Sequence, residues 1–390
     1  MLYRTCRIAF GGLALIAALA VHASAQEARV DLESTLAAAK ANRPEIEKAL
    51  RDVPADQRPG MVFLISNMPE RDLTTLQANY LLTNVRLAYQ TRSEVPWGSQ
   101  IPEEIFLNDV LPFSNVDESR DDWRQEFHDL CLPLVKDCKT PGDAAVNLNS
   151  QIFKILNVKY STARRAANQG PKESMTSGLA SCTGLSIILS DACRSVGIPA
   201  RLVGTPMWSN KRGNHTWVEV WDNGWHFTGA CEQDPLGLDR GWFVGDAAQA
   251  VEDSSENAIY AASFRKSKTS FPLVWDLANR SVFAENVTRR YTQKDAAAGA
   301  PGKVRVLIRV VDEAGKRIQK TVTVYSNGAD KVLFEGASRG ESADTNDILE
   351  ATLDANQAYQ VRVDHQVLDF KTPEKAAQAE VQFVLKKASN

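Results

Sequence analysis

The sequence predicts an α+β protein whose central element is a helix that begins at Cys182 and packs on an antiparallel sheet. Apolar residues recur at spacings of three and four in residues 26–140 and again after Cys182, which is typical of amphipathic helices. From Ala200 the apolar period changes to two, and Asn223-Gly224 is a strong signal for a hairpin turn between strands. Short alternating segments after residue 302 predict a small antiparallel β-sandwich.

The composition is that of an ordinary globular chain. Its 390 residues are 44% hydrophobic and 24% charged, which leaves room for two or three domains. The net charge is -3, and no basic run or arginine-aromatic stretch marks a groove that follows phosphates. We therefore expect no nucleic-acid partner.

Residues 1–25 have the pattern of a secretory signal peptide. Two arginines precede an apolar run over residues 8–21, and Ala-Ser-Ala at 23–25 provides a cleavage site before Gln26. The alternative is a membrane anchor, but an apolar run of about 14 residues is shorter than the ~20 that a spanning helix needs. We expect a mature chain without a membrane span that is secreted or periplasmic.

The mature chain keeps an odd number of cysteines, so at least one thiol stays unpaired in an oxidising compartment. The five cysteines are Cys131, Cys138, Cys182, Cys193 and Cys231. Cys131 and Cys138 flank a short loop and are predicted to form a disulfide, the alternative being two buried free thiols. Cys182 and Cys193 lie about three helical turns apart, too distant to bridge each other. The pairing of Cys193 and Cys231 stays open.

The N-terminal region, residues 26–140, is predicted to be helical, with helices over 32–41, 44–53 and 72–92. Two proline-bracketed apolar segments between residues 95 and 109 are typical of chain that crosses another domain's surface. Three carboxylates there could form a substrate subsite or a cation site, namely Glu103, Glu104 and Asp109. Without a partner motif, solvated carboxylates at a helix start are the favoured interpretation.

The next two helices lead to the cysteine. One begins at Thr140-Pro141, and the second begins at Cys182 with Ser181 as its N-cap and ends before Gly197. The N-terminus of a helix carries unsatisfied N–H groups and a partial positive charge, which stabilise a thiolate and an oxyanion. Cys182 is therefore placed as a nucleophile.

The register of the hairpin brings a histidine and a carboxylate together. If Asn223 and Gly224 are the two turn residues, His215 lies directly opposite Glu232, whose carboxylate can then reach a ring nitrogen. A single bulge would shift the pairing and put the neighbouring cysteine, residue 231, opposite His215 instead. Asp234 shares the face of Glu232 and is the reserve candidate.

Cys182, His215 and Glu232 together meet the needs of thiol acyl transfer. His215 would take the thiol proton and hold the thiolate, Glu232 would orient the imidazole, and N–H groups at the helix start would receive the oxyanion. In the alternative, non-catalytic interpretation, Cys182 packs as a small apolar residue, and His215 and Glu232 lie on a strand surface. The combination with an unpaired thiol in an exported protein favours catalysis.

The C-terminal region carries no chemistry that the sequence reveals. Residues 293–302 have the composition of a linker, and residues 303–390 are the predicted sandwich. The chain shows no metal-ligand spacing and no phosphate-binding loop, so we predict no cofactor and no metal site.

Three segments carry a resemblance to a known family. They are Ala180-Ser181-Cys182-Thr183-Gly184-Leu185, Cys193-Arg194-Ser195-Val196-Gly197-Ile198-Pro199-Ala200-Arg201 and Asn214-His215-Thr216-Trp217-Val218-Glu219-Val220-Trp221. Residues 145–250, the core of a predicted domain 141–292, are thereby similar to the transglutaminase-like superfamily of secreted bacterial proteins. The resemblance implies a papain-like α+β core and a Cys-His-Asp triad, to which Cys182 and His215 correspond.

The chain departs from the family at the third position. Where the family usually has an aspartate in the returning strand, this chain reads Trp225-His226-Phe227-Thr228-Gly229-Ala230, and the first carboxylate is Glu232. Glu232 could complete the triad, or the site could be a Cys-His dyad. Gln169 and Ser174 are candidates for a side-chain donor to the oxyanion.

The resemblance implies an exported cysteine enzyme that acts on amide or peptide bonds through a Cys182 thioester. We expect hydrolysis rather than protein crosslinking, because nothing suggests the calcium sites or large companion domains of crosslinking enzymes. The expected partner is a peptide or protein substrate, for instance of the cell envelope. The alternative is a non-catalytic binding or structural module built on a degenerate core. The sequence leaves the substrate and the oligomeric state open.

Overall fold

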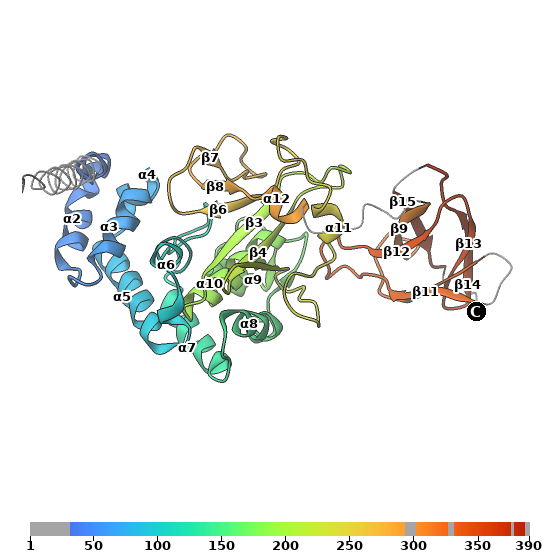
Figure 1. Cartoon of the computed structure of the whole chain (residues 1–390), viewed down its shortest axis with the longest axis horizontal. Coiled ribbons are helices and arrows are strands. Elements are labelled where there is room, and N and C mark those ends of the chain that lie inside the picture. The colour runs from blue at the N-terminus through green and yellow to red at the C-terminus, as the bar shows by residue number, and fades with distance from the viewer. Residues whose placement is uncertain (1–31, 293–301, 327–330, 376–377, 387–390) are drawn as a thin grey trace, which may run out of the picture.

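The computed structural model describes residues 32–292, 302–326, 331–375 and 378–386. Along its longest axis the molecule has an N-terminal helical part, a central part with a six-stranded sheet, and a C-terminal part made of strands (Figure 1). This arrangement confirms the predicted α+β class. The predicted signal peptide, 1–25, and the predicted linker apart from Gly302 lie outside the described residues. Within those residues no helix is both long and apolar enough to cross a membrane.

The N-terminal part consists of short helices around a shared apolar core that contains Leu81 and Phe106. The helices are η1 Lys40–Asn42, α2 Arg43–Asp52, α3 Arg58–Asn67, α4 Glu70–Thr75, α5 Ala78–Glu94, η2 Gly98–Gln100 and α6 Glu103–Asp109. The prediction of a single helix over 72–92 is wrong in one respect. Leu76 and Gln77 have extended backbones, and they separate α4 from α5.

Asp109, the last residue of α6, is buried rather than solvated. Glu103 and Glu104 do lie exposed in the first turn of α6. Asp109 is 2% exposed and accepts a hydrogen bond from Asn108 Nδ2 at 3.1 Å. Burial raises the pKa of Asp109 to about 6, although the nearby Arg201 cation opposes the shift.

We expect Asp109→Asn to stabilise the protein above that pKa. The folded state binds the Asp109 proton more tightly than the unfolded state, so this contribution to stability is lost as the pH rises from 3.8 through about 6. A shift of about two pKa units corresponds to about 3 kcal/mol. Urea unfolding at about pH 4 and about pH 8 should show that the advantage of the variant over the wild type grows with pH. An equal advantage at both pH values would contradict this expectation.

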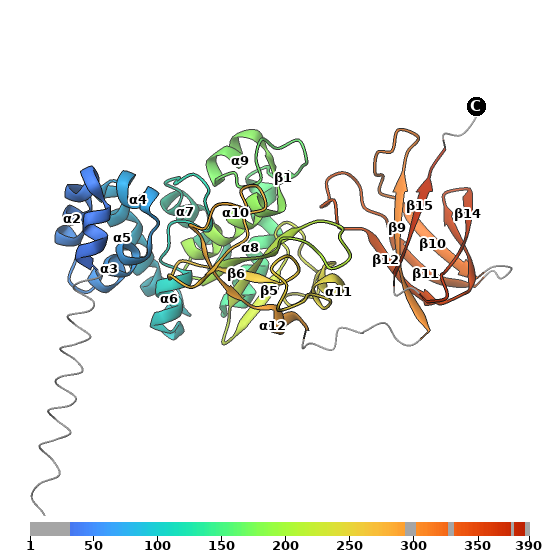
Figure 2. The same ribbon diagram turned by 90° about the horizontal axis from the view of Figure 1, so that it is seen from above.

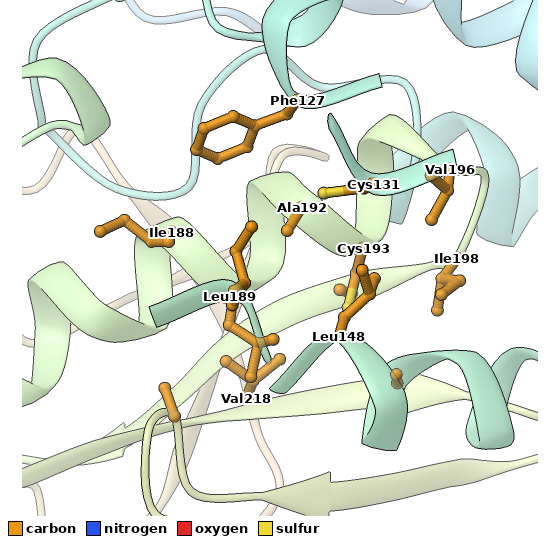
Figure 3. Close-up of a cluster of buried hydrophobic side chains, with 14 of the residues drawn as sticks. Phe127, Cys131, Leu148, Ile188, Leu189, Ala192, Cys193, Val196, Ile198 and Val218 are labelled. Atoms are coloured by element: carbon orange, nitrogen blue, oxygen red, sulfur yellow. The ribbon is translucent and has the colours of Figure 1, made fainter. Parts of the chain in front are cut away.

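Helix α10, Cys182–Ser195, is the central element of the molecule. It contacts helices α7 (Arg124–Val135) and α8 (Pro141–Ile155) and strands β3 (Ala200–Thr205) and β4 (His215–Trp221). Figure 3 shows Ile188, Leu189 and Ala192 of α10 among side chains of α7, α8 and β4. Every residue of α10 after Cys182 is buried, so close packing along the whole helix fixes the position of the cysteine.

The predicted disulfide between Cys131 and Cys138 is wrong, because all five cysteines within the described residues are free thiols. Cys131 lies on the buried face of α7 beside α10 (Figure 3), where burial raises its pKa to about 12. Cys138 lies beyond the end of α7 and is partly exposed. Because α7 continues past Cys131 to Val135, most of the predicted loop between the two cysteines is helix.

The central sheet has the strand order β5-β4-β3-β6-β8-β7, and neighbouring strands are antiparallel. Its remaining strands are β5 Trp225–Thr228, β6 Tyr260–Ser263, β7 Thr269–Ser270 and β8 Phe283–Asn286. Short elements complete this part, namely β1 Lys159–Tyr160, α9 Pro171–Ser177, β2 Leu179–Ala180, α11 Val244–Ala247 and α12 Thr288–Thr292. Strands β1 and β2 form a separate parallel pair.

The predicted register between β4 and β5 is wrong by one residue. Trp221 pairs with Trp225, so the turn has three residues, from Asp222 to Gly224. Asn223 has a φ of 56°, and the Asp222 N–H donates a hydrogen bond to the Gly224 carbonyl at 2.9 Å. Strand β5 also ends at Thr228, so the strand does not carry Glu232 to a position opposite His215.

The C-terminal part is a two-sheet sandwich with the strand orders β11-β10-β13-β14 and β12-β9-β15. The strands are β9 Lys303–Val311, β10 Thr321–Ser326, β11 Val332–Ala337, β12 Leu349–Asp354, β13 Ala358–Val363, β14 Gln366–Lys371 and β15 Gln378–Val384. Strand β15 pairs in parallel with β9, unlike the antiparallel prediction, because β14 lies in the other sheet and the chain crosses over before β15. The loop between β11 and β12, the 338–348 loop, extends from the sandwich toward the central part (Figure 2).

Candidate active site

Cys182 is the first residue of α10. Ser181 is the N-cap, and its hydroxyl oxygen accepts a hydrogen bond from the Gly184 N–H at 3.0 Å, which confirms the predicted cap. The same hydroxyl donates to the Ala167 carbonyl at 2.5 Å and ties the helix start to the preceding loop. Cys182 is partly exposed, unlike the rest of α10. The thiol therefore lies at the positive end of a helix dipole and is accessible.

His215 is the first residue of β4 and lies in an aromatic pocket. Its ring centroid is 4.6 Å from that of Trp242, 5.1 Å from that of Phe243 and 5.8 Å from that of Trp217. The side chain is 1% exposed, and within the described part of the chain neither ring nitrogen makes a hydrogen bond. The rings fix the plane of the imidazole, and its two nitrogens face carboxylates.

Glu232 faces Nε2 of His215 as the sequence predicts, but the predicted strand pairing does not place it there. Its Oε2 lies 3.8 Å from Nε2 and accepts a hydrogen bond from Trp242 Nε1 at 2.8 Å. The chain reaches this position through a turn after β5, in which Cys231 has a φ of 66°. Asn149 of α8 holds that turn, because its Oδ1 accepts a hydrogen bond from the Cys231 N–H at 2.9 Å.

The second carboxylate at His215 comes from the C-terminal sandwich, for which the sequence predicts no site residue. Asp344 lies in the 338–348 loop, is 2% exposed and places Oδ2 3.7 Å from Nδ1 of His215. One ligand-type atom each of Cys182, His215 and Asp344 lies within 4.8 Å of the other two. Asp344 is therefore close to the sulfur as well as to the imidazole. A carboxylate that only orients the imidazole is expected on the ring nitrogen remote from the nucleophile.

Hydrogen bonds hold the 338–348 loop against the central part. The hydroxyl groups of Tyr160 and Thr345 are 2.8 Å apart. Asn346 donates from Nδ2 to the Asn214 carbonyl at 3.0 Å, and the Asn346 carbonyl accepts from Arg212 at 2.5 Å. These contacts directly follow Asp344 in the chain and position its side chain at His215.

Three acidic groups surround one imidazole. Burial by itself lowers the pKa of His215, but Asp344, Cys182 and Glu232 outweigh it and hold the pKa of His215 well above its ordinary value. Burial by itself raises the pKa of Asp344, yet the imidazole and the Asn346 N–H bring that pKa below its ordinary value. Burial raises the pKa of Glu232 to about 7. At neutral pH the site therefore contains an imidazolium paired with the Asp344 carboxylate.

The other candidate residues have different roles in the structure. Asp234, the reserve carboxylate, lies 3.4 Å from Arg240, measured from Oδ1 to Nε. Gln169 donates from Nε2 to a backbone carbonyl at 3.4 Å, and Ser174 is fully buried. A Cβ on Gly184 would lie 3.6 Å from Ser174 Oγ and 3.7 Å from the Gln169 carbonyl oxygen. Gln169 and Ser174 thus pack under the first turn of α10.

A cavity of about 420 Å³ lies beside the site and is lined by both the central part and the sandwich. Its walls include Leu185, Glu232 and Trp242 on one side and Arg339 and Asp347 of the 338–348 loop on the other. A cavity of this size accommodates a side chain or a small molecule.

Comparison with known proteins finds a family model that matches much of the central part. The model of the transglutaminase-like superfamily matches residues 128–247, a range that includes Cys182, His215 and Glu232. No curated protein matches the chain.

Solved structures resemble the chain more weakly. A candidate cysteine protease from Cytophaga hutchinsonii has 19% identity and a TM-score of 0.28, with 48% of this chain and 58% of that chain covered. The TIE protein of Bacillus anthracis has 12% identity and a TM-score of 0.18, with 49% and 31% covered. Red sea bream transglutaminase has 10% identity and a TM-score of 0.31, with 71% and 65% covered. The chain spans less than two thirds of the length of each of these proteins. The assignment rests on the family match, which gives the chain a transglutaminase-like core over residues 128–247.

Proposed function

We propose that the protein is an exported cysteine enzyme that hydrolyses or transfers an acyl group at amide or peptide bonds. The observation that carries this proposal is the partly exposed Cys182 at the start of α10, with His215 and Glu232 beside it. Cys182 Sγ attacks the carbonyl carbon, and His215 holds the thiol proton. That proton passes to the departing amine, which leaves a thioester on Cys182. Water then releases the acid, or a second amine accepts the acyl group.

The surroundings of the thiol support this chemistry. N–H groups in the first turn of α10 are donors for the oxyanion, and the aromatic rings around His215 keep water from the imidazole. The predicted signal peptide over 1–25 supports a place of action in the periplasm or outside the cell. The substrate class is a peptide or protein.

Turnover by this route requires the 338–348 loop to move. A reacting carbonyl carbon must come within about 3.5 Å of the nucleophile. The Asp344 carboxylate lies within 4.8 Å of the Cys182 sulfur, so it competes for that space. Its negative charge also disfavours both a thiolate and an oxyanion. The arrangement with Asp344 beside the sulfur is therefore a closed state of the proposed enzyme.

The second candidate function is a non-catalytic binding or structural module, and two observations favour it. Glu232 Oε2 is 3.8 Å from His215 Nε2, beyond hydrogen-bond distance, and the aspartate that is usual in the family is missing. A module of this kind would engage a partner through its surface and would need no reactive thiol.

Alkylation of the thiols distinguishes the two functions. We expect iodoacetamide at about pH 6 to modify Cys182 at least about tenfold faster than Cys138 or Cys231 of the same molecule. Burial raises the pKa of Cys231 to about 11 and the pKa of Cys138 above its ordinary value, so both serve as slow internal references. Peptide mass spectrometry of the native, non-reduced protein, freed of metal by a chelator, measures the three sites together. Equal rates at all three would reject the enzyme and leave the binding module.

A further inference from the structure

We propose that Cys182, His215 and Asp344 form a zinc site that joins the central part to the C-terminal sandwich. A sulfur, a ring nitrogen and a carboxylate oxygen of these residues lie within 4.8 Å of one another, and His215 Nδ1 and Asp344 Oδ2 are 3.7 Å apart. Bonds from zinc to nitrogen, oxygen and sulfur are about 2.0–2.3 Å long, so tetrahedral ligands lie roughly 3.3–3.7 Å apart. The spacing of the histidine nitrogen and the aspartate oxygen already falls at the upper end of this range, and the sulfur lies within 4.8 Å of both.

The ring nitrogens of His215 face carboxylates at 3.7 Å and 3.8 Å, distances that are longer than those of ordinary hydrogen bonds. Its side chain is 1% exposed, and among the described residues neither Nδ1 nor Nε2 has a hydrogen-bond partner. Buried polar atoms without partners are uncommon in native structures, and a bound ion is one of the few explanations for them. Nδ1 faces Asp344, so an ion placed between them would bind both groups and replace the proton that the imidazolium otherwise holds.

The set of ligand atoms selects the kind of metal. Calcium and magnesium prefer oxygen ligands only, which a thiol and an imidazole do not supply. Thiolate, imidazole and carboxylate are together the ligand types of zinc. Three protein ligands leave one tetrahedral position for water or for a group that enters from the neighbouring cavity of about 420 Å³.

Groups behind the ligands orient them. Glu232 faces Nε2 of His215 at 3.8 Å, and Trp242 Nε1 donates to Glu232 at 2.8 Å. A carboxylate behind a metal-bound histidine fixes the ring and strengthens it as a ligand. On the other side, Asp344 Oδ1 accepts a hydrogen bond from the Asn346 N–H at 2.8 Å, which leaves Oδ2 for the metal.

The site would give the C-terminal sandwich a function. Cys182 and His215 belong to the central part and Asp344 to the sandwich, so the ion would fasten the 338–348 loop over the thiol. The sulfur would be a metal ligand and could not attack a carbonyl. Zinc binding and acyl transfer are therefore mutually exclusive, and the metal site stands whether or not the thiol is catalytic.

Metal titration of the full mature chain under a phosphine reductant tests the proposal. We expect one equivalent of Co²⁺ to produce sulfur-to-cobalt charge-transfer absorption in the near ultraviolet, which Zn²⁺ then displaces. Cys182→Ala should abolish the band. Asp344→Asn and Asp344→Ala should weaken Zn²⁺ binding by at least about 100-fold, measured by competition with a chromophoric chelator. Asp344→Asn keeps the shape of the side chain and an acceptor for the Asn346 N–H, so folding is preserved.

Cys231→Ala and Asp347→Asn are matched controls. Both residues line the adjacent cavity but are outside the three-residue cluster, and both variants should bind Zn²⁺ like the wild type. Wild-type affinity in Asp344→Asn would mean that thiol and imidazole hold the ion alone, and the inter-domain site would be rejected. A wild type without the Co²⁺ band would reject the site altogether. Acyl transfer is tested separately, by alkylation of the metal-free protein.

Discussion

Replacing His215 by alanine should slow acylation of Cys182 by about 100- to 10,000-fold. The imidazole lies beside the sulfur, and the acidic groups around it hold its pKa well above the ordinary value, so it is a cation at neutral pH. As a cation it stabilises the thiolate, and it later donates a proton to the leaving group. The alanine variant loses both contributions. An activated ester such as p-nitrophenyl acetate acylates the thiol without knowledge of the natural substrate, and release of nitrophenolate gives the rate.

Two further variants show whether the loss belongs to the imidazole. Glu232→Gln should slow acylation by about tenfold, because Glu232 acts on the thiol only through the ring of His215. Asp234→Asn should leave the rate unchanged, because Asp234 pairs with Arg240. Circular dichroism should show that all the variants are folded. A rate for His215→Ala close to that of the wild type would contradict its assignment as the base.

The sequence predicts the parts of the site that depend on local patterns. The start of α10 and its Ser181 cap follow from apolar spacing and capping chemistry, which act over a few residues. The hairpin register does not follow from local patterns, because one additional residue in the turn shifts every residue pair along β4 and β5. Glu232 reaches His215 through a turn with Cys231 at positive φ. Residues other than glycine rarely adopt that conformation, and no sequence pattern signals it here.

Asp344 has no signal in the sequence. Its contact with His215 depends on how the sandwich packs against the central part, and that packing rests on side chains far apart in the chain. The Tyr160–Thr345 hydrogen bond and the ion pair between Arg305 and Asp246 are examples. Sequence patterns over neighbouring residues predict each domain separately. A site with residues from two domains depends on contacts between them, which only the folded chain provides.

Glu219→Ala should reduce the free energy of unfolding by about 3–5 kcal/mol, because it removes the buried carboxylate that pairs with Arg201 and leaves that buried cation only the exposed carboxylate of Glu285. Glu219 lies in the middle of β4 and is 1% exposed. It accepts hydrogen bonds from Arg201 Nε of β3 at 3.0 Å, Arg290 Nη1 of α12 at 2.7 Å and Tyr291 Oη at 2.8 Å. Arg201 is equally enclosed, with its guanidinium 3.8 Å from the ring centroid of Trp225. Urea unfolding of wild type and variant measures the loss.

Glu252→Ala is the matched control, because Glu252 pairs at 2.6 Å with Arg289, which precedes Arg290 in α12. The side chain of Arg289 is 73% exposed. An exposed pair contributes at most about 1 kcal/mol. Equal losses in the two variants would show that burial does not determine the effect.

The comparison also bears on the site, because the strand that carries Glu219 begins at His215. A displacement of about 1 Å in a catalytic group can cost about 100-fold in rate. Glu219→Ala should therefore slow alkylation of Cys182 even where the protein is folded, and Glu252→Ala should not.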